Sequence, residues 1–447
     1  MPLSLPGVSR DSRLLTDGAW ALGGKGLTTI FGVATNALLA RLLSLEDLGA
    51  FFLVSSVVLV SAIVAQAGLA PTVVRLVAES IGLGQQARAR AAATKALHLG
   101  VISAGMVALL FAVAVGQWIA VSIFESALMA GVLFIAAVWI VPLSVQGILG
   151  ETFRGFGDIR SATVFGGLLT SAFLALSLAA WWLTGLKVDL GGVMTLAIAA
   201  SVVSVMAGLI VLGRIVSMLP TGGQISTRDA LGIAAPLLVT NIMGAVVMQA
   251  DLWIVGAFRS ENEVAIYGAA ARVAVLVVMP LWIMNSVVAP LIARYIVQGR
   301  KEELQRLLRV AASWAGYTAI AVTLVFGIWG EELLSIVFGP SFRAGTTVLI
   351  LLSVGQLAIV LTGSCGTTLI MAGHQRVVMW IAVVCGMTLL VSAAGVAPAY
   401  GAIGVACVVA VLNILQNVAT LLAARKLVGI WTHCGFPRMA HQTGGQK

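Results

Sequence analysis

Four ionisable residues lie inside long apolar stretches, where a charge is costly. Lys25 lies in ALGGKGLTT, Asp251 in VMQADLWIV and Arg272 in AAARVAVLV, and Arg41 comes near the end of the first apolar stretch. Charged residues in such surroundings usually face a cavity or a partner, so all four are candidates for ligand contact. Because three of these residues are cations and one is an acid, they favour an anionic ligand. Guanidinium binds phosphate oxygens with two hydrogen bonds, and lysine supplies a compact charge.

Polar amides in the same stretches are expected to complete this site. The expected substrate-binding residues are Lys25, Asn36, Arg41, Asn241, Gln249, Asp251, Arg272 and Asn285. Two structural roles stand as alternatives. In one, Lys25 and Asp251 form a salt bridge that only joins two parts of the protein. In the other, Arg41 extends to the headgroups of a bilayer.

The composition is that of a membrane protein. Of the 447 residues, 60% are hydrophobic and 10% are charged, which is too little charge to coat a soluble protein of this size. Twelve apolar stretches are long enough to cross a bilayer. They run over about 18–42, 48–78, 97–117, 128–150, 160–184, 190–214, 230–257, 264–293, 310–330, 346–371, 377–398 and 401–424. We therefore expect an all-α polytopic membrane protein with about twelve transmembrane helices.

The basic residues between these stretches indicate the topology. With the N-terminus in the cytoplasm, twenty of the 26 Lys and Arg residues fall on the cytoplasmic side, and Lys187, Arg259 and Arg343 fall on the other. Such a bias follows the positive-inside rule and places both termini in the cytoplasm. It also explains the net charge of +9 without nucleic acid as a partner.

The sequence repeats itself at a nearly constant offset. APTVVR at 70–75 matches APLIAR at 289–294, and GDIR at 157–160 matches GHQR at 373–376, with offsets of 219 and 216. Six spans separate equivalent points, so the halves form parallel repeats, which in transporters border the substrate path. The expected parts are a cytoplasmic N-terminal segment 1–17, a six-helix lobe 18–214, a linker 215–229, a six-helix lobe 230–424 and a basic tail 425–447.

Motifs for enzymatic chemistry are missing from the sequence. The GGKG at 23–26 lacks the earlier glycine and the following Ser or Thr of a phosphate-binding loop. HExxH, GxSxG and Cys/His clusters are also missing, so we expect neither an enzyme nor a metal or other cofactor. Transport would then be driven by an H⁺ or Na⁺ gradient, by the gradient of the substrate, or by a partner.

Three ordered segments resemble the bacterial polysaccharide-biosynthesis flippases. The first is ARLLSLEDLGAFF at 40–52 with GLAPTVVR at 68–75, the second is QADLWIVGAFRSENEVAIYGAAARV at 249–273, and the third is LLSIVFGPSFRAG at 333–345 with AGHQR at 372–376. These flippases include the O-antigen (Wzx) type and belong to the multidrug/oligosaccharidyl-lipid/polysaccharide (MOP) exporter superfamily. The likeness extends over about 15–425.

This resemblance implies two six-helix lobes in a V-shaped bundle, as in MATE transporters. It also implies that undecaprenyl-pyrophosphate-linked oligosaccharide is flipped from the inner to the outer leaflet of the bacterial inner membrane, for exopolysaccharide, capsule or O-antigen export. The partners would be this polyprenyl-linked glycan, the bilayer and a polysaccharide polymerase or export complex. Lys25 and Arg272 match positions where the family carries lumenal cations, but the second span has no internal cation.

Two other functions are weighed against this one. A multidrug exporter of the same superfamily, coupled to Na⁺ or H⁺, would need acids deep in the cavity, and Asp251 is the one such acid identified. A non-transporting scaffold for glycan assembly would gain nothing from intramembrane charges. For transport we expect the two lobes to rock between inward-open and outward-open states.

Overall fold

The protein is described by a computed structural model that covers residues 10–185 and 188–435. Within these ranges the regular secondary structure is entirely helical, which confirms the all-α expectation. The first nine residues of the expected segment 1–17, and the tail from residue 436, lie outside the described residues, as does Lys187. The chain divides into two compact units.

Unit 1 extends to Ala269 and also includes Val337–Gly339. Its α-helices are α1 (Arg10–Leu42), α2 (Leu45–Ala65), α3 (Leu69–Gly82), α4 (Gln86–Leu110), α5 (Gly116–Trp118), α6 (Ala127–Gly131), α7 (Leu133–Gly155), α8 (Ile159–Thr163), α9 (Leu169–Thr184), α10 (Leu190–Ser217), α11 (Thr227–Phe258) and most of α12 (Glu261–Ala274). Three π-helical segments, η1 (Phe111–Val115), η2 (Ile119–Ile123) and η3 (Val164–Leu168), interrupt them.

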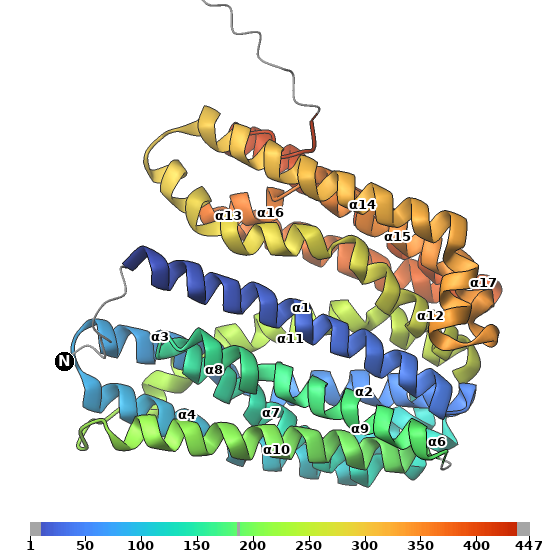
Figure 1. The fold of residues 1–447 in the computed structure, drawn as a ribbon, viewed down its shortest axis with the longest axis horizontal. Helices are drawn as coiled ribbons and strands as arrows, with labels where there is room; N and C mark the ends of the chain where they lie inside the picture. Colours follow the sequence, from blue (N-terminus) through green and yellow to red (C-terminus); the bar gives the residue numbers. More distant parts are fainter. Residues whose placement is uncertain (1–9, 186–187, 436–447) are drawn as a thin grey trace, which may run out of the picture. The chain divides into compact units, whose positions relative to one another are not determined.

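Helix α7 lies at the centre of unit 1. It packs against α2, α3, α4 and α10, and Ile148, Leu149 and Phe153 on α7 are fully buried. Figure 1 shows α1 running beside α8 and α9, which it contacts. Unit 1 is therefore a helical bundle built around one apolar helix, with the lysine-bearing helix α1 on its α8–α9 side.

Unit 2 contains Ala270–Ile336 and the chain from Pro340 onwards. Its helices are the end of α12, η4 (Val275–Val277), α13 (Met279–Val297), α14 (Lys301–Phe338), η5 (Pro340–Gly345), α15 (Thr346–Thr362), α16 (Cys365–Met371) and α17 (Gln375–Leu427). Buried residues of α13, α14, α16 and α17 form a core with Val428 and Ile430.

The boundary between the compact units differs from the expected lobe boundary. It falls at Ala269 and not inside the expected linker 215–229, because α11 packs on α2 and α3 of unit 1. The linker is also shorter than expected, since α10 continues to Ser217 and α11 begins at Thr227. The lobes 18–214 and 230–424 remain a prediction that rests on the sequence repeat.

Among the described residues, nine helices are long and apolar enough to cross a membrane. The number rises to ten if the bent pair Glu261–Val277 and Met279–Asn285 is counted as one span. Helix α17 is counted once, although its 53 residues would extend about 80 Å. Its backbone leaves the helical region at Gly401 (φ 58, ψ −149), a conformation that favours glycine, so α17 holds two spans. Helix α1 is long enough but less apolar, so the expected number of about twelve spans stays a prediction beside the nine or ten found among the described residues.

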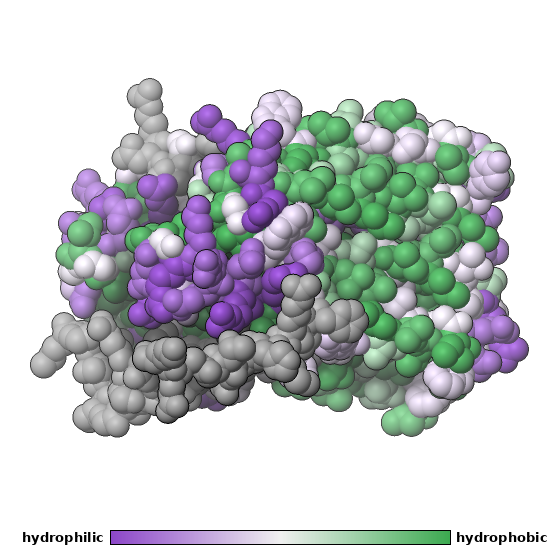
Figure 2. Space-filling model, turned by 90° about the horizontal axis from the view of Figure 1, so that it is seen from above, coloured by the Kyte–Doolittle hydropathy of each residue, from purple (hydrophilic) through white to green (hydrophobic). Residues whose placement is uncertain are grey.

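The exposed surface fits contact with lipid. Leu109, Leu183 and Ile328 are each more than half exposed on these helices. On the face drawn in Figure 2, hydrophobic residues cover a broad area and hydrophilic residues gather towards one end. In water such a surface would be unfavourable, whereas in a bilayer it matches the surrounding hydrocarbon.

Each expected six-helix lobe is followed by a strap that folds back on the helix of that lobe's third expected span. Residues 218–226, the linker strap, lie against α4, where Arg90 Nη1 donates to the Leu219 carbonyl at 2.8 Å and Lys95 Nζ donates to the Ile225 carbonyl at 2.5 Å. Residues 428–435, the C-terminal strap, lie against α14, where the Trp431 N–H donates to Gln305 Oε1 at 2.8 Å. The same arrangement after both expected lobes is what a parallel repeat predicts.

The C-terminal strap also satisfies the last carbonyls of α15. The buried Thr432 Oγ1 donates to the Thr362 carbonyl and the Cys434 N–H donates to the Leu361 carbonyl, both at 2.8 Å. Ser313 Oγ on α14 donates to the Gly435 carbonyl at 2.8 Å. Because a helix leaves its last carbonyls without intrahelical partners, the strap completes α15.

We expect Thr432→Val to lower the stability of the protein, because it keeps the side-chain volume and removes the donor to Thr362. The loss should be about 1–3 kcal/mol, the cost of leaving a buried acceptor unsatisfied. The apparent melting temperature in detergent measures it. Thr195→Val is the control, since Thr195 is exposed and bonds only within its own helix, and it should change little. Equal melting temperatures for all three proteins would contradict the assignment.

Candidate functional site

Helix α1 carries three of the expected site residues, on two different faces. Lys25 and Asn36 are eleven residues apart, which is three helical turns, so they share a face about 16 Å apart along the axis. The Lys25 side chain is exposed and Asn36 is half-buried, with its amide donating to the Gly32 carbonyl at 2.7 Å. Arg41 is sixteen residues from Lys25 and therefore projects from nearly the opposite face.

Arg41 contacts the end of another helix. Its Nε lies 3.4 Å from the carbonyl of Val337, in the last turn of α14, and that turn belongs to unit 1. A cation at the C-terminal end of a helix interacts favourably with the free carbonyls there. Arg41 therefore has a structural contact at this end of α1, in addition to any contact with a substrate.

The backbone of α1 at Lys25 is fixed by close contact with α8. A Cβ added at Gly24 would lie 2.1 Å from Thr163 Cγ2, so the two helices meet at Gly24 and Thr163 without room for another carbon. Because Lys25 is the next residue, its place depends on this contact.

Helix α11 carries Asn241, Gln249 and Asp251, which do not share one face. Gln249 and Asp251 are two residues apart and so project to nearly opposite sides. Asp251 is half-buried, and its Oδ2 accepts a hydrogen bond of 2.7 Å from the hydroxyl of the fully buried Tyr267. The expected Lys25–Asp251 salt bridge remains a prediction.

Tyr267 is a partner that sequence reasoning did not identify. Tyr267 belongs to the segment that resembles the flippase family, but no spacing rule predicts that a tyrosine sixteen residues after an aspartate will bond it. Nearby, Trp253 Nε1 donates to Ser56 Oγ of α2 at 2.8 Å, and Gly256 lies against Leu53. Helices α11 and α2 are therefore joined by polar and close apolar contacts inside unit 1.

Unit 2 holds the remaining two expected residues. Arg272 is half-buried in the last turn of α12. Asn285 lies on α13, and its Oδ1 accepts a hydrogen bond from Ser364 Oγ. Between them the eighth span bends by 46° near Val278.

The second span is also interrupted. Ala67 and Gly68 have φ of 50° and 70° between α2 and α3. Gly68 also packs tightly against α11, because a Cβ at this position would lie 2.1 Å from the Ala234 carbonyl oxygen. Interrupted spans at corresponding positions of two repeats often mark the substrate path of a transporter. The sequence repeat predicts that the second and eighth spans correspond in this way.

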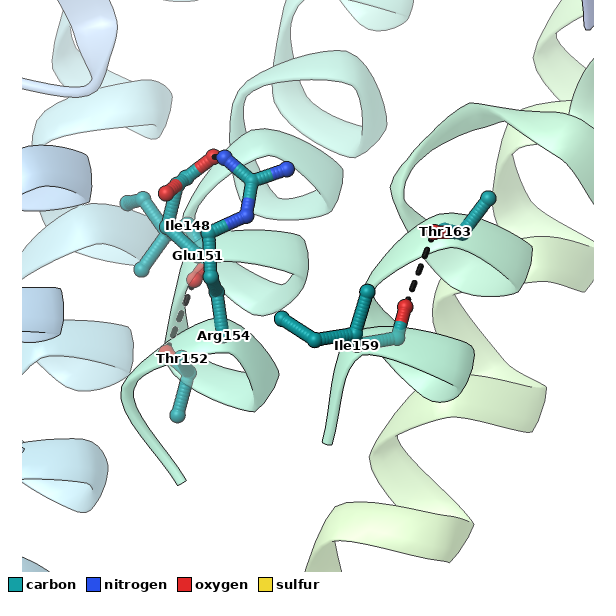
Figure 3. Close-up of polar contacts among 6 residues, drawn as sticks. All are labelled: Ile148, Glu151, Thr152, Arg154, Ile159 and Thr163. Atoms are coloured by element: carbon teal, nitrogen blue, oxygen red, sulfur yellow. Dashed lines mark hydrogen bonds and ion pairs between the residues drawn. The ribbon is translucent and has the colours of Figure 1, made fainter. Parts of the chain in front are cut away.

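An ion pair at the end of α7 was also missed. Figure 3 shows Glu151 and Arg154 side by side one turn apart, with Arg154 Nη1 2.6 Å from Glu151 Oε1. Glu151 is 30% exposed and Arg154 is 54% exposed. It was overlooked because the apolar stretch was expected to end at residue 150, whereas α7 continues to Gly155. Glu151 is therefore a second acid within a span-length helix, in addition to Asp251 on α11.

Metal ligands do not cluster in the described part of the chain: no group of three or more His, Cys, Asp or Glu residues is placed to hold an ion. The expected site residues are instead dispersed along α1, α11, α12 and α13.

Comparison with known families decides the family. The model described as polysaccharide biosynthesis protein matches residues 14–296, which is more than half of the chain. The chain belongs to the polysaccharide biosynthesis protein family. The MatE model also matches, over residues 236–394. A comparison with curated proteins found no match.

Solved structures share the fold at low identity. The chain is similar to the inward-facing conformation of a multidrug resistance MATE family transporter of the MOP superfamily, with 17% identity, a TM-score of 0.69 and coverage of 90% of this chain and 94% of that one. The lipid II flippase MurJ in an inward closed conformation gives 12% identity, a TM-score of 0.69 and coverage of 90% and 86%. A MOP superfamily transporter from Pyrococcus furiosus gives 16% identity and a TM-score of 0.65, with coverage of 92% of this chain and 94% of that one.

The family and the fold together confirm the expected resemblance. The chain belongs to the polysaccharide biosynthesis protein family, and its fold is shared by a MATE family transporter of the MOP superfamily and by the lipid II flippase MurJ.

The Gly24–Thr163 contact gives a reciprocal test. Gly24→Ala should destabilise the protein by about 1–3 kcal/mol, because the new carbon overlaps Thr163 Cγ2. Thr163→Ala removes that methyl group, so the double variant should recover most of the loss. Apparent melting temperatures of the single and double variants in detergent measure this coupling. Additive losses in the double variant would show that the two residues do not meet.

Proposed function

We propose that this protein flips an undecaprenyl-pyrophosphate-linked oligosaccharide from the inner to the outer leaflet of a bacterial inner membrane, for export of exopolysaccharide, capsule or O-antigen. The observation that carries the proposal is Lys25. It is an exposed cation on a long, largely apolar helix of a member of the polysaccharide biosynthesis family. An intramembrane cation is retained where it meets an anion.

The charge balance supports a pyrophosphate headgroup. Lys25 supplies a compact charge, Arg272 a planar guanidinium, and Asn36, on the face of Lys25, an amide that suits sugar hydroxyls. Arg41 lies at the far end of α1 and would meet the substrate there while it contacts the end of α14. The similar flippase MurJ is named for a lipid-linked substrate, lipid II.

A second candidate function is Na⁺- or H⁺-coupled multidrug export. The MatE match over 236–394 and the similarity to a multidrug resistance MATE transporter favour it. Such an exporter needs acids within the membrane, and Glu151 is a second acid in a span-length helix in addition to Asp251. The excess of cations in the membrane argues against it, because cationic drugs would be repelled.

Proteoliposomes separate the two functions. Flipping is followed as the loss of a short lipid-pyrophosphate-oligosaccharide from one leaflet, and drug export as the efflux of ethidium, with and without H⁺ and Na⁺ gradients. Flipping without efflux supports the proposal, efflux alone supports the exporter, and neither activity indicates a scaffold for a polymerase or export complex. The response to each gradient identifies the coupling ion.

Neutralising Lys25 should weaken the interaction with the lipid-linked substrate. Lys25→Gln removes a charge-assisted contact worth about 1.5–3 kcal/mol, which corresponds to a rise of about 10- to 100-fold in the half-saturating substrate concentration. The flipping assay measures this rise. Lys426→Gln is the control, because Lys426 is an exposed cation in the last turn of α17, and it should behave as wild type. A Lys25→Gln protein with normal flipping would rule out the anion site.

Alternating access is the proposed mechanism, with both termini in the cytoplasm. The outer ends near Glu46 and Glu261 should separate during the cycle, and in this state Gly49 lies so close to Glu261 that an added Cβ would be 2.0 Å from its carbonyl oxygen. A disulfide between Glu46→Cys and Glu261→Cys should stop flipping, and a reductant should restore it. Unchanged flipping with the bridge formed would contradict this mechanism.

A further inference from the structure

The fifth span is broken inside unit 1. Helix α8 ends at Thr163, η3 makes a π-helical turn over Val164–Leu168, and Gly167 has φ 167° and ψ −31° before α9 begins. Short π-helical turns disrupt the regular ladder of backbone hydrogen bonds and are frequent at functional sites. The break lies close to α7, because a Cβ on Gly150 would be 3.0 Å from the Cα of Gly166.

Two side chains donate to the carbonyl at this break. Gln146 Nε2 of α7 lies 3.1 Å from the Phe165 carbonyl oxygen, and Ser204 Oγ of α10 lies 3.2 Å from the same oxygen. Gln146 Nε2 is also 2.7 Å from Thr170 Oγ1, on the first turn of α9. Three helices therefore meet in one polar cluster.

The cluster is buried, which makes each of its contacts costly to lose. Gln146 is 3% exposed and Ser204 is fully buried. An amide placed in such apolar surroundings is unfavourable unless it is hydrogen-bonded. The sequence alone gave no reason to select Gln146, since it is a single polar residue within the apolar run IVPLSVQGILG.

The break is connected to Lys25 through two residues. Phe165 lies two residues after Thr163, and Thr163 is the residue against which Gly24 packs. Gly24 directly precedes Lys25. In addition, Arg160 of α8 lies over the ring of Trp20 on α1, 4.8 Å from its centroid. Any change in the direction of α8 at the break would therefore move α1 at Lys25.

We propose that Gln146 is a positioning residue for Lys25. By holding the Phe165 carbonyl, it fixes the angle at which α8 leaves the break, and so it fixes Thr163 against Gly24 and the lysine beside it. Gln146 itself does not touch the substrate. The role in substrate binding rests on the proposed function, whereas the positioning of α1 does not.

The test measures the position of α1 without any substrate. The four cysteines, which are all free, are replaced by alanine, and Lys25→Cys is introduced as a reporter. The rate at which a hydrophilic maleimide labels residue 25 is then compared between this parent protein and its Gln146→Met derivative, which keeps a similar length and loses the donor. We expect the labelling rate to change by about fivefold, the equivalent of one buried hydrogen bond in an equilibrium.

Two further variants control the result. Ser201→Ala removes a buried hydroxyl from the same helix as Ser204, where it bonds Ala197 and Trp139 and not the break, so labelling should stay as in the parent. Ser204→Ala removes only one of the two donors to Phe165 and should give a smaller change in the same direction. It also provides the measurement if Gln146→Met does not fold.

Flipping assays with Lys25 intact complete the test. Gln146→Met should raise the half-saturating concentration of the lipid-pyrophosphate-oligosaccharide about fivefold and leave the maximal rate within about twofold. Labelling of residue 25 that is unchanged in both Gln146→Met and Ser204→Ala overturns the proposal. If the parent protein does not flip the lipid at all, the proposed function fails, and the labelling rates still decide whether Gln146 positions α1.

Discussion

A backbone carbonyl that loses its helical partner inside a membrane has no water to bond, so the protein itself must provide a donor. Much of this structure is organised by that constraint. The Phe165 carbonyl accepts hydrogen bonds from Gln146 and Ser204. The carbonyls of Leu361 and Thr362 accept hydrogen bonds from the C-terminal strap. Each break or helix end is thus tied to a residue far away in the sequence, and these ties join the helices of a unit.

Several cations also donate to backbone carbonyls in or next to helix ends. Arg90, Lys95 and Arg41 lie near helix ends and donate to the carbonyls of Leu219, Ile225 and Val337. Lys25, which lies well inside its helix, presents an exposed side chain. A count of basic residues therefore overstates the charge available to a substrate, because Arg41, Arg90 and Lys95 also bond backbone carbonyls.

Several features of the fold were predictable from the sequence because they depend on local composition. The apolar stretches gave the spans, and the boundary expected between 398 and 401 coincides with the break at Gly401. The breaks at Ala67–Gly68 and at 164–168 were not predicted, since a glycine in an apolar run is equally compatible with a continuous helix. The partners Tyr267 and Gln146 depend on contacts between distant segments, and no spacing rule reveals them. For the same reason the sequence identified Arg41 as a cation near a span end and not as a partner of Val337.

The two straps also impose an order on the making of the protein. The linker strap is synthesised near the middle of the chain, so its carbonyls can bond Arg90 and Lys95 while synthesis continues. The C-terminal strap follows all the helices of unit 2 in the sequence, and until it has been synthesised the end of α15 lacks the donors from Thr432 and Cys434. Domains generally fold in the order in which they emerge. Unit 2 can therefore reach its final packing only after its C-terminal strap has been synthesised, since Val428 and Ile430 of the strap are part of its core.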